Sequence, residues 1–194
     1  MVGNFQPDGA LHQMGTRPAS DDWGRHSLMI RHLLVAAMPY LFAGTVQADE
    51  SAFLGSLEGR WAGGGMVRVR IDRTPINVSC NLNSQATDVA LSLKGTCRGL
   101  ILISRSIGAD LQFTGANYSG TYVGPSGRKS TLTGKRRGSA INLTIHWARE
   151  VNGDRRANLT LQRVGENGMK LVTVDVDPKT GNSVVTSEIN LQKK

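Results

Sequence analysis

The feature that most constrains how this chain can fold is an alternation of apolar and polar side chains with a period of two. In the stretch "INVSCNLN", Ile76, Val78, Cys80 and Leu82 share one parity, and serine and asparagine take the other. The stretch "VALSLKGTC" repeats the pattern. Successive side chains of a β-strand point to opposite faces, so this period predicts strands with one buried face.

Segments of this kind follow one another to the C-terminus, with turn sequences such as "GPSG", "VNGD", "GENG" and "PKTGN" between them. We count about ten strands at spacings of roughly 8–12 residues, and no convincing amphipathic helix among them. Short hairpins with one apolar face are typical of an antiparallel barrel or sandwich, and closing the sheet protects its edges. We therefore predict an all-β fold, an antiparallel up-and-down β-barrel of about 8–10 strands.

The first strand is expected to include "VRVRI", with Val67, Val69 and Ile71 on one face and Arg68 and Arg70 facing outward. The glycines of "AGGGM" directly precede this segment. No helix start follows them and no Lys-Ser/Thr pair closes the motif, so a phosphate-binding loop is not indicated. We expect these glycines to relieve crowding or to form a bulge where the strand bends.

Residues 29–48, "MIRHLLVAAMPYLFAGTVQA", have the pattern of a secretory signal peptide. Arg31 and His32 follow a methionine, an apolar core comes next, and Val46 and Ala48 occupy the positions that a signal peptidase inspects. No run reaches the roughly 18 apolar residues that a spanning helix needs, so we expect no transmembrane anchor in the mature chain. No cysteine lies near the cleavage site, so a lipid anchor is not expected either.

This signal peptide divides the chain into three parts. Residues 1–28 form an N-terminal extension that is either untranslated, with Met29 in place of Met1 as the start, or disordered. Residues 29–48 are removed, and residues 49–194 form a single exported barrel domain. We place the mature protein in the periplasm or outside the cell.

The two cysteines of the chain, Cys80 and Cys97, both fall in the exported part and share parity with the apolar side chains of their strands. Two cysteines in an exported domain are most simply a disulfide. We therefore predict a buried Cys80–Cys97 bond, which in the chain-entropy model stabilises the fold by about 3 kcal/mol.

The net charge of +8 also belongs to the exported part, because the acidic and basic residues before Asp49 cancel. A positive surface attracts polyanions, and an envelope offers lipopolysaccharide and acidic polysaccharide. Nucleic acid is not expected as a partner, since stacking aromatic residues are not interleaved with the charges. A solvated basic surface without a partner is the alternative. The candidate polyanion-binding residues are Arg68, Arg70, Arg128, Lys129, Lys135, Arg136, Arg137, Arg155 and Arg156.

Catalytic groups are scarce in the exported part. Its one histidine, His146, should face outward, where it lacks the nucleophile and acid that a catalytic base needs. One histidine and two paired cysteines do not make a zinc site. Asp175 and Asp177 in "DVDPKTGN" could be calcium ligands or a carboxylate pair, but a hairpin turn with Asp177 bonded to local backbone is the simpler interpretation. We expect no enzymatic activity, no cofactor and no metal.

Several short motifs resemble known exported barrels. Gly59-Arg60-Trp61 resembles the Gly-x-Trp of the calycins (lipocalins, avidins and small exported metalloprotease inhibitors), which implies that Trp61 plugs one barrel end. The segments "YSGTY", "LTG" and "LTIHW" are similar to avidin strands, but "GGGMV" lacks the polar ligands for biotin. The set "GRWAGGG", "C…GTCRG", "YSGTY" and "DVDPKTGN" is similar to a group of exported bacterial proteins of unknown function. Trp61, Tyr122 and Trp147 are thus candidate plug or ligand-lining residues.

These observations predict an exported, non-enzymatic β-barrel that binds or supports something in the cell envelope, with anionic surface polymers as the first candidate. Two other functions stay open. The protein could inhibit an exported hydrolase or protease, or it could carry a small ligand in the barrel mouth as calycins do. The sequence leaves the ligand and the oligomeric state undefined.

Overall fold

The computed structural model describes residues 43–99 and 103–194, which form one α-helix and ten β-strands. The helix α1 spans Ala43–Ser56. The strands are β1 (Gly59–Val67), β2 (Ile76–Ala86), β3 (Ala90–Gly99), β4 (Ile103–Thr114), β5 (Asn117–Val123), β6 (Lys129–Arg137), β7 (Ala140–Val151), β8 (Asp154–Val164), β9 (Gly168–Val176) and β10 (Ser183–Lys193).

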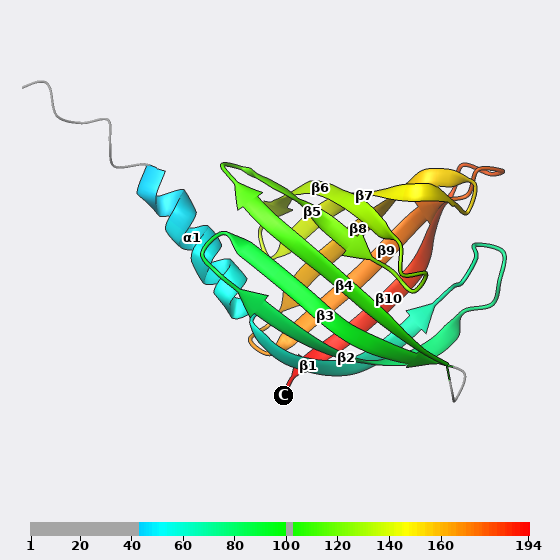
Figure 1. Cartoon of the computed structure of the whole chain (residues 1–194), viewed down its shortest axis with the longest axis horizontal. Coiled ribbons are helices and arrows are strands. Elements are labelled where there is room, and N and C mark those ends of the chain that lie inside the picture. The colour runs from blue at the N-terminus through cyan, green and yellow to red at the C-terminus, as the bar shows by residue number, and fades with distance from the viewer. Residues whose placement is uncertain (1–42, 100–102) are drawn as a thin grey trace, which may run out of the picture. The chain divides into compact units, whose positions relative to one another are not determined.

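The ten strands close into an antiparallel barrel (Figure 1). Each strand pairs with its neighbours in the sequence, and β1 pairs with β10 to complete the ring. This up-and-down order confirms the predicted all-β barrel, at the upper limit of the expected strand number. We call the end of the barrel with the turns at 87–89, 115–116, 138–139 and 165–167 the closed end, and the opposite end the open end.

Side-chain burial follows the predicted period of two. On β7, Ile141, Leu143 and Ile145 are buried while Asn142 between them is exposed. The alternation predicted for "INVSCNLN" appears on β2, where Cys80 and Leu82 are buried. The inner faces of the strands therefore supply one continuous apolar core inside the barrel.

The prediction for the first strand is wrong in its position. β1 ends at Val67, so Arg68 and Arg70 lie in the loop before β2 rather than on an outer strand face. Val69, expected to share a face with Val67, is 72% exposed. The strand ends where β2 begins, because Val67 pairs with Ile76, the first residue of β2. On its other side β10 continues past this level, and Arg68 N still donates to Thr186 O.

The glycines of β1 relieve crowding, as one of the two alternatives predicted. A side chain at Gly63 or Gly65 would collide with the carbonyl oxygens of Asn190 and Glu188 on β10. The pairing register is continuous through this stretch on both sides, so the alternative of a bulge at the glycines is wrong. The irregularity lies across from β9 instead, at Thr186 of β10.

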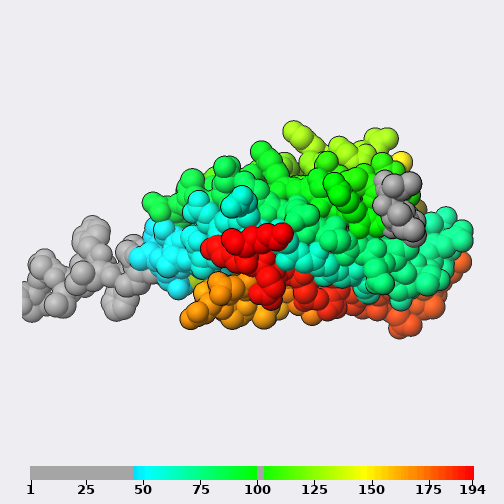
Figure 2. Space-filling view, turned by 90° about the horizontal axis from the view of Figure 1, so that it is seen from below, coloured from blue at the N-terminus to red at the C-terminus, as the bar shows by residue number. Residues whose placement is uncertain are grey.

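The helix α1 covers the closed end. Phe53, Leu54 and the following Leu57 are buried in the barrel core, and Leu57 O accepts a hydrogen bond from Trp61 Nε1 at 3.1 Å. Trp61 itself is 1% exposed. The end of β10 (red) also reaches this end of the molecule, beside α1 (cyan), where Lys194 N donates to Arg60 O (Figure 2).

A buried acid of α1 completes this closure. Glu50 accepts hydrogen bonds from the Tyr118 hydroxyl and from Arg136 Nε, the latter at 2.9 Å. The Arg136 guanidinium also pairs with Asp49 and lies 4.8 Å from the ring centre of Phe53. Burial is the main cause that raises the pKa of Tyr118, and the Glu50 carboxylate raises it further.

The predicted signal peptide overlaps the described residues only at 43–48, which form the first part of α1. The extension 1–28 and residues 29–42 lie outside the described residues. Within the described chain, no helix is long and apolar enough to cross a bilayer.

Candidate ligand-binding cavity

The open end of the barrel contains a cavity of about 550 Å³, which we call the outer cavity. Its walls come from β1 to β7, β9 and β10 and from the loops after β1, β5 and β7. Ligand pockets of proteins have volumes of roughly 300–1,000 Å³, so this space can hold a small molecule.

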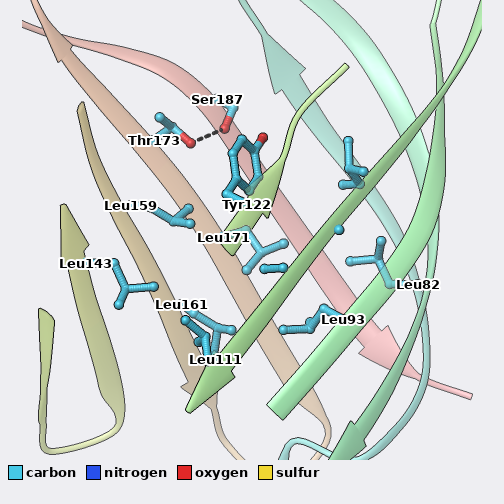
Figure 3. Close-up of a pocket in the computed structure, with 13 residues that line it drawn as sticks. Leu82, Leu93, Leu111, Tyr122, Leu143, Leu159, Leu161, Leu171, Thr173 and Ser187 are labelled. Atoms are coloured by element: carbon cyan, nitrogen blue, oxygen red, sulfur yellow. Dashed lines mark hydrogen bonds between the residues drawn. The ribbon is translucent and has the colours of Figure 1, made fainter. Parts of the chain in front are cut away.

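A smaller space of about 60 Å³, the inner cavity, lies deeper in the barrel (Figure 3). Both cavities are lined by Ile107, Tyr122, Thr173 and Ser187, so the two adjoin at this level. The inner cavity is otherwise almost entirely aliphatic, with leucines from several strands converging on it: Leu82, Leu93, Leu111, Leu143, Leu159, Leu161 and Leu171.

Three inward-facing residues of β9 lie at successive depths in the barrel. Leu171 lines only the inner cavity, Thr173 lines both, and Asp175 lines only the outer one. Thr173 Oγ1 also accepts a hydrogen bond from Ser187 Oγ at 3.0 Å, beside Tyr122 in Figure 3. Along β9 the lining therefore changes from apolar to polar toward the mouth.

Two aromatic side chains form part of the outer wall. The rings of Tyr122 and Trp147 meet edge to face, with their centres 6.0 Å apart. Burial raises the pKa of Tyr122 to about 12, so its hydroxyl stays protonated at neutral pH. The indole Nε1 of Trp147 is buried without a hydrogen-bond partner.

Asp175 is a buried carboxylate in the wall of this cavity, with 3% of its surface exposed. Its Oδ2 atom accepts a hydrogen bond from Thr186 Oγ1 at 2.6 Å, while Oδ1 has no partner. The irregularity of β10 at Thr186 gives this residue its inward position, and Thr186 is itself buried. Burial raises the pKa of Asp175, and the hydrogen bond from Thr186 opposes that rise.

Four arginines surround the mouth: Arg68, Arg105, Arg128 and Arg149 all line the outer cavity. Within the described chain none of the four forms a salt bridge. Arg68 Nη1 donates to Arg73 O at 2.9 Å, and Arg68 Nε is buried without a partner. The mouth is therefore positively charged around a largely apolar interior.

The predicted basic residues do not form one surface. Arg68 and Arg128 lie at the mouth, whereas Lys135, Arg136 and Arg137 lie near the closed end. The remaining four are divided among the loops and strand ends of the open end: Arg70 pairs with Asp72 at 3.1 Å, Arg155 donates to Ala148 O at 2.9 Å, and Lys129 and Arg156 are exposed.

Arg136 differs most from its predicted place among exposed charges. Its side chain is 18% exposed and holds α1 against the barrel through Glu50 and Asp49. It points inward because inner and outer positions alternate on β6, so Lys135 and Arg137 are the exposed members of the run.

The three aromatic candidates also separate. Trp61 lies at the closed end, in the core under α1, whereas Tyr122 and Trp147 line the outer cavity. The Cys80–Cys97 disulfide is confirmed, and the two residues face each other across β2 and β3 with their Cα atoms 4.1 Å apart. Cys80 is fully buried, and half-buried Cys97 contributes to the cavity wall.

His146 faces outward as predicted, with its Nε2 atom 3.4 Å from Thr133 Oγ1 on the neighbouring strand. Asp177 bonds its own turn, where it accepts from Lys179 N and Thr180 Oγ1, both at 2.9 Å. β9 ends before Asp177, so the two aspartates occupy different environments.

Sequence reasoning missed Arg105 and Arg149, and it placed Asp175 at the edge of a turn rather than in a cavity wall. The two arginines are isolated in the sequence, and only barrel closure brings them to one mouth. For Asp175 a signal existed: it shares parity with Leu171 and Thr173, so an inward carboxylate could have been inferred.

Fold and cavity together define a class: an up-and-down barrel of ten strands, covered by a helix at one end and open to a charged mouth at the other. No protein-family model and no curated protein matches the sequence. The solved structures that resemble it include the crystal structure of Rv2717c from M. tuberculosis. That likeness has a TM-score of 0.57 and 15% identity, and covers 73% of this chain and 94% of the other.

At this identity the likeness shows a shared fold and transfers no activity. The resemblances to lipocalins, avidins, exported metalloprotease inhibitors and exported proteins of unknown function find no support in these comparisons and stay predictions.

Proposed function

We propose that this protein is an exported, non-enzymatic binding protein that carries a small amphiphile in the open end of its barrel. The apolar part of the ligand lies toward the inner cavity, and an anionic head group lies among the arginines of the mouth. Of the functions predicted from the sequence, the small-ligand carrier fits the cavity best.

The observation that carries this proposal is the polarity gradient along the barrel axis. Aliphatic side chains line the deep part, and the four arginines of the mouth form no ion pair with a carboxylate among residues 43–99 and 103–194. Burying an alkyl chain gains about 0.8 kcal/mol per CH₂ group, whereas the arginines favour an anion at the entrance. A ligand with both parts satisfies both regions.

Calorimetric titration of the purified protein with dodecanoate, dodecanol and butyrate tests this proposal. Dodecanoate should bind with a ratio of one per chain, dodecanol more weakly, and butyrate not measurably. Raising the salt concentration should weaken dodecanoate binding more than dodecanol binding, because salt screens the exposed charges.

Two variants locate the site. Ile107→Trp fills the junction of the two cavities and should weaken dodecanoate binding at least about tenfold. Val164→Trp adds the same ring at an exposed position near the closed end and should leave binding unchanged. Equal binding by both variants would place the ligand elsewhere.

A second pair tests the charges. The double variant Arg105→Gln with Arg149→Gln removes two exposed ion pairs with the carboxylate of the ligand. Each such pair contributes about 0.5 kcal/mol, so dodecanoate binding should weaken about fivefold. Arg137→Gln with Arg156→Gln removes the same charge away from the cavity lining and serves as the matched control. If the control pair weakens binding as much, net charge rather than the mouth attracts the ligand.

The other functions predicted from the sequence give different results in the same experiments. A protein that binds lipopolysaccharide or acidic polysaccharide through its surface would respond to the control pair and ignore Ile107→Trp. An inhibitor of a hydrolase would bind none of the amphiphiles. Export itself is tested by N-terminal sequencing of the protein from the native envelope, which should begin near Asp49.

A further inference from the structure

The open end of the barrel carries most of the net positive charge of the protein. Its loops, together with the three strand residues next to each loop, contain eleven basic and five acidic residues. The rest of the chain from Asp49 onward contains nine basic and seven acidic residues. The open end therefore has a net charge of +6, out of the total of +8.

Few of the basic residues at the open end are neutralised by a neighbouring acid. Within residues 43–99 and 103–194, Arg70 with Asp72 is the one ion pair at this end. Asp175 is buried in the cavity wall, and Asp177 is bonded to its own turn. The cations of the open end are thus available to an external anionic surface.

Exposed aliphatic side chains lie among these charges. Val69 in the loop between β1 and β2 is 72% exposed, and Ile103 at the start of β4 is 47% exposed. Both line the outer cavity, as does exposed Pro125 in the loop after β5. The loop between β1 and β2 projects from the end of the barrel opposite α1 (Figure 1). Apolar side chains that gather at one exposed end, with polar residues around them, mark an interaction site.

The combination of cations and aliphatic side chains fits a lipid bilayer better than a soluble polyanion. An anionic bilayer presents phosphates at its surface and hydrocarbon directly beneath them. Arginines bind phosphates, and aliphatic side chains that project among the arginines reach the apolar layer. A soluble polyanion would match the charges but leave Val69 and Ile103 in water.

We infer that the open end of the barrel docks on a bilayer that contains anionic lipids, with Val69 and Ile103 at the head-group boundary and the arginines against the phosphates. Docking requires no ligand in the cavity, so this inference goes beyond the proposed function and is tested separately from it. In the docked protein the cavity mouth faces the bilayer, so an amphiphile passes between the two without crossing water.

Sedimentation of the whole protein with lipid vesicles tests the inference. Vesicles of phosphatidylcholine with about 30% phosphatidylglycerol should bind the protein at least about tenfold more tightly than vesicles of phosphatidylcholine alone. Raising the salt concentration from about 0.1 M to about 1 M should remove most of this preference, because the Debye length falls from about 10 Å to about 3 Å. Equal binding to both kinds of vesicle at the lower salt concentration would refute docking on anionic lipid.

A matched pair of double variants locates the docking surface without altering the cavity. Arg73→Gln with Lys179→Gln removes two exposed charges from open-end loops, and neither residue lines the outer cavity. Each basic residue near an anionic surface contributes about fivefold to binding, so vesicle affinity should fall about 25-fold. The control, Lys135→Gln with Arg137→Gln, removes the same charge from exposed positions of β6 near the closed end and should change the affinity less than about twofold. Equal losses in the two double variants would overturn docking through the open end.

A tryptophan in the projecting loop reports contact with the bilayer. In Val69→Trp, the emission of the added ring should shift to shorter wavelength on vesicles with phosphatidylglycerol, because tryptophan prefers the boundary between head groups and hydrocarbon. Val164→Trp places the same ring at an exposed position at the end of β8, near the closed end, and its emission should stay unchanged. The native tryptophans are common to both variants, so the difference between the spectra isolates the added ring. If Val69→Trp binds these vesicles without a shift, charge alone holds the protein and the apolar contact with the bilayer is refuted.

The variant Ile107→Trp separates docking from the uptake of a lipid into the cavity. It fills the junction of the two cavities and should bind vesicles as tightly as the wild type does. If it loses vesicle binding, a lipid chain inside the cavity holds the protein, which overturns the docking surface and supports the proposed function. If the wild type binds dodecanoate but no vesicles, docking is refuted while the proposed function stands.

Discussion

Removing the Arg136 guanidinium should destabilise the barrel far more than removing a neighbouring exposed charge. In the variant Arg136→Gln, Glu50 loses its cation while it stays buried, with only 5% of its side chain exposed. The variant also removes the contact with the Phe53 ring and the hydrogen bond to Gly138 O. The variant therefore leaves the buried Glu50 carboxylate at the closed end without the Arg136 guanidinium.

The expected magnitude follows from burial. Breaking a buried ion pair by removing one partner costs about 3–5 kcal/mol, and the 18% exposure of the Arg136 side chain favours the lower value. We therefore expect the free energy of unfolding to fall by about 3 kcal/mol. For a domain of this size that corresponds to a fall in melting temperature of about 6–12 °C.

Urea unfolding followed by circular dichroism measures the effect, with Arg137→Gln as the control. Arg137 is exposed on the other face of β6, and its removal should change stability by less than about 0.5 kcal/mol. The variant Glu50→Gln and the double variant complete a cycle, whose coupling energy should exceed about 1 kcal/mol. If Arg136→Gln and Arg137→Gln have equal stability, Arg136 does not hold α1 to the barrel.

Three other predictions concern stability. Trp61→Ala should lower the free energy of unfolding by about 3–5 kcal/mol, measured by urea unfolding, because the ring is buried and bonded to Leu57 O; a loss below about 1 kcal/mol would contradict its role as a plug. Replacing Cys80 and Cys97 by alanine should cost about 3 kcal/mol, and the native protein should not react with thiol reagents before reduction. The pKa of Asp175 is raised by burial, so the folded protein gains stability from its protonation at low pH and loses this gain as pH rises through the raised pKa. Relative to Asp175→Asn, the wild type should therefore become less stable as pH rises from about 4 to 7, and a constant difference would refute the buried environment.

The strands were predictable because burial alternates along them. On β2 and β7 the side chains that face the barrel interior are the apolar ones that the alternation in the sequence predicts. The first strand was misplaced because its central residues are glycines, which have no side chains to carry the pattern. The alternation in "VRVRI" continues past Val67 in the sequence, but β2 begins opposite Val67, so β1 has no partner on that side beyond this residue.

The helix α1 was missed although its signal is present. Glu50, Phe53, Leu54 and Leu57 recur at the spacing of one helix face, and all four are buried. The helix Ala43–Ser56 spans the predicted cleavage site, so its residues were divided between a signal peptide and a mature N-terminus. Arg136 was misassigned for the same reason, since its partner Glu50 had no predicted structure.

The cavity could be predicted only in part. Tyr122 and Trp147 were candidates for the lining, but the mouth also depends on Arg105 and Arg149, which no run of charges marks. On a strand, neighbouring charges point to opposite faces, so the run Lys135-Arg136-Arg137 cannot form one patch. Residues far apart in the sequence make the charged mouth, and only the closed barrel defines that set.

The most direct test of the central claim uses the two tryptophans of the barrel as opposite reporters in one nuclear magnetic resonance titration. Trp147 lines the outer cavity, whereas Trp61 Nε1 is bonded to Leu57 O at the closed end. On addition of dodecanoate, the indole N–H signal of Trp147 should shift and saturate at one ligand per chain, while that of Trp61 stays in place. A saturating change confined to Trp61, or none at either ring, would contradict a ligand site in the open end of the barrel.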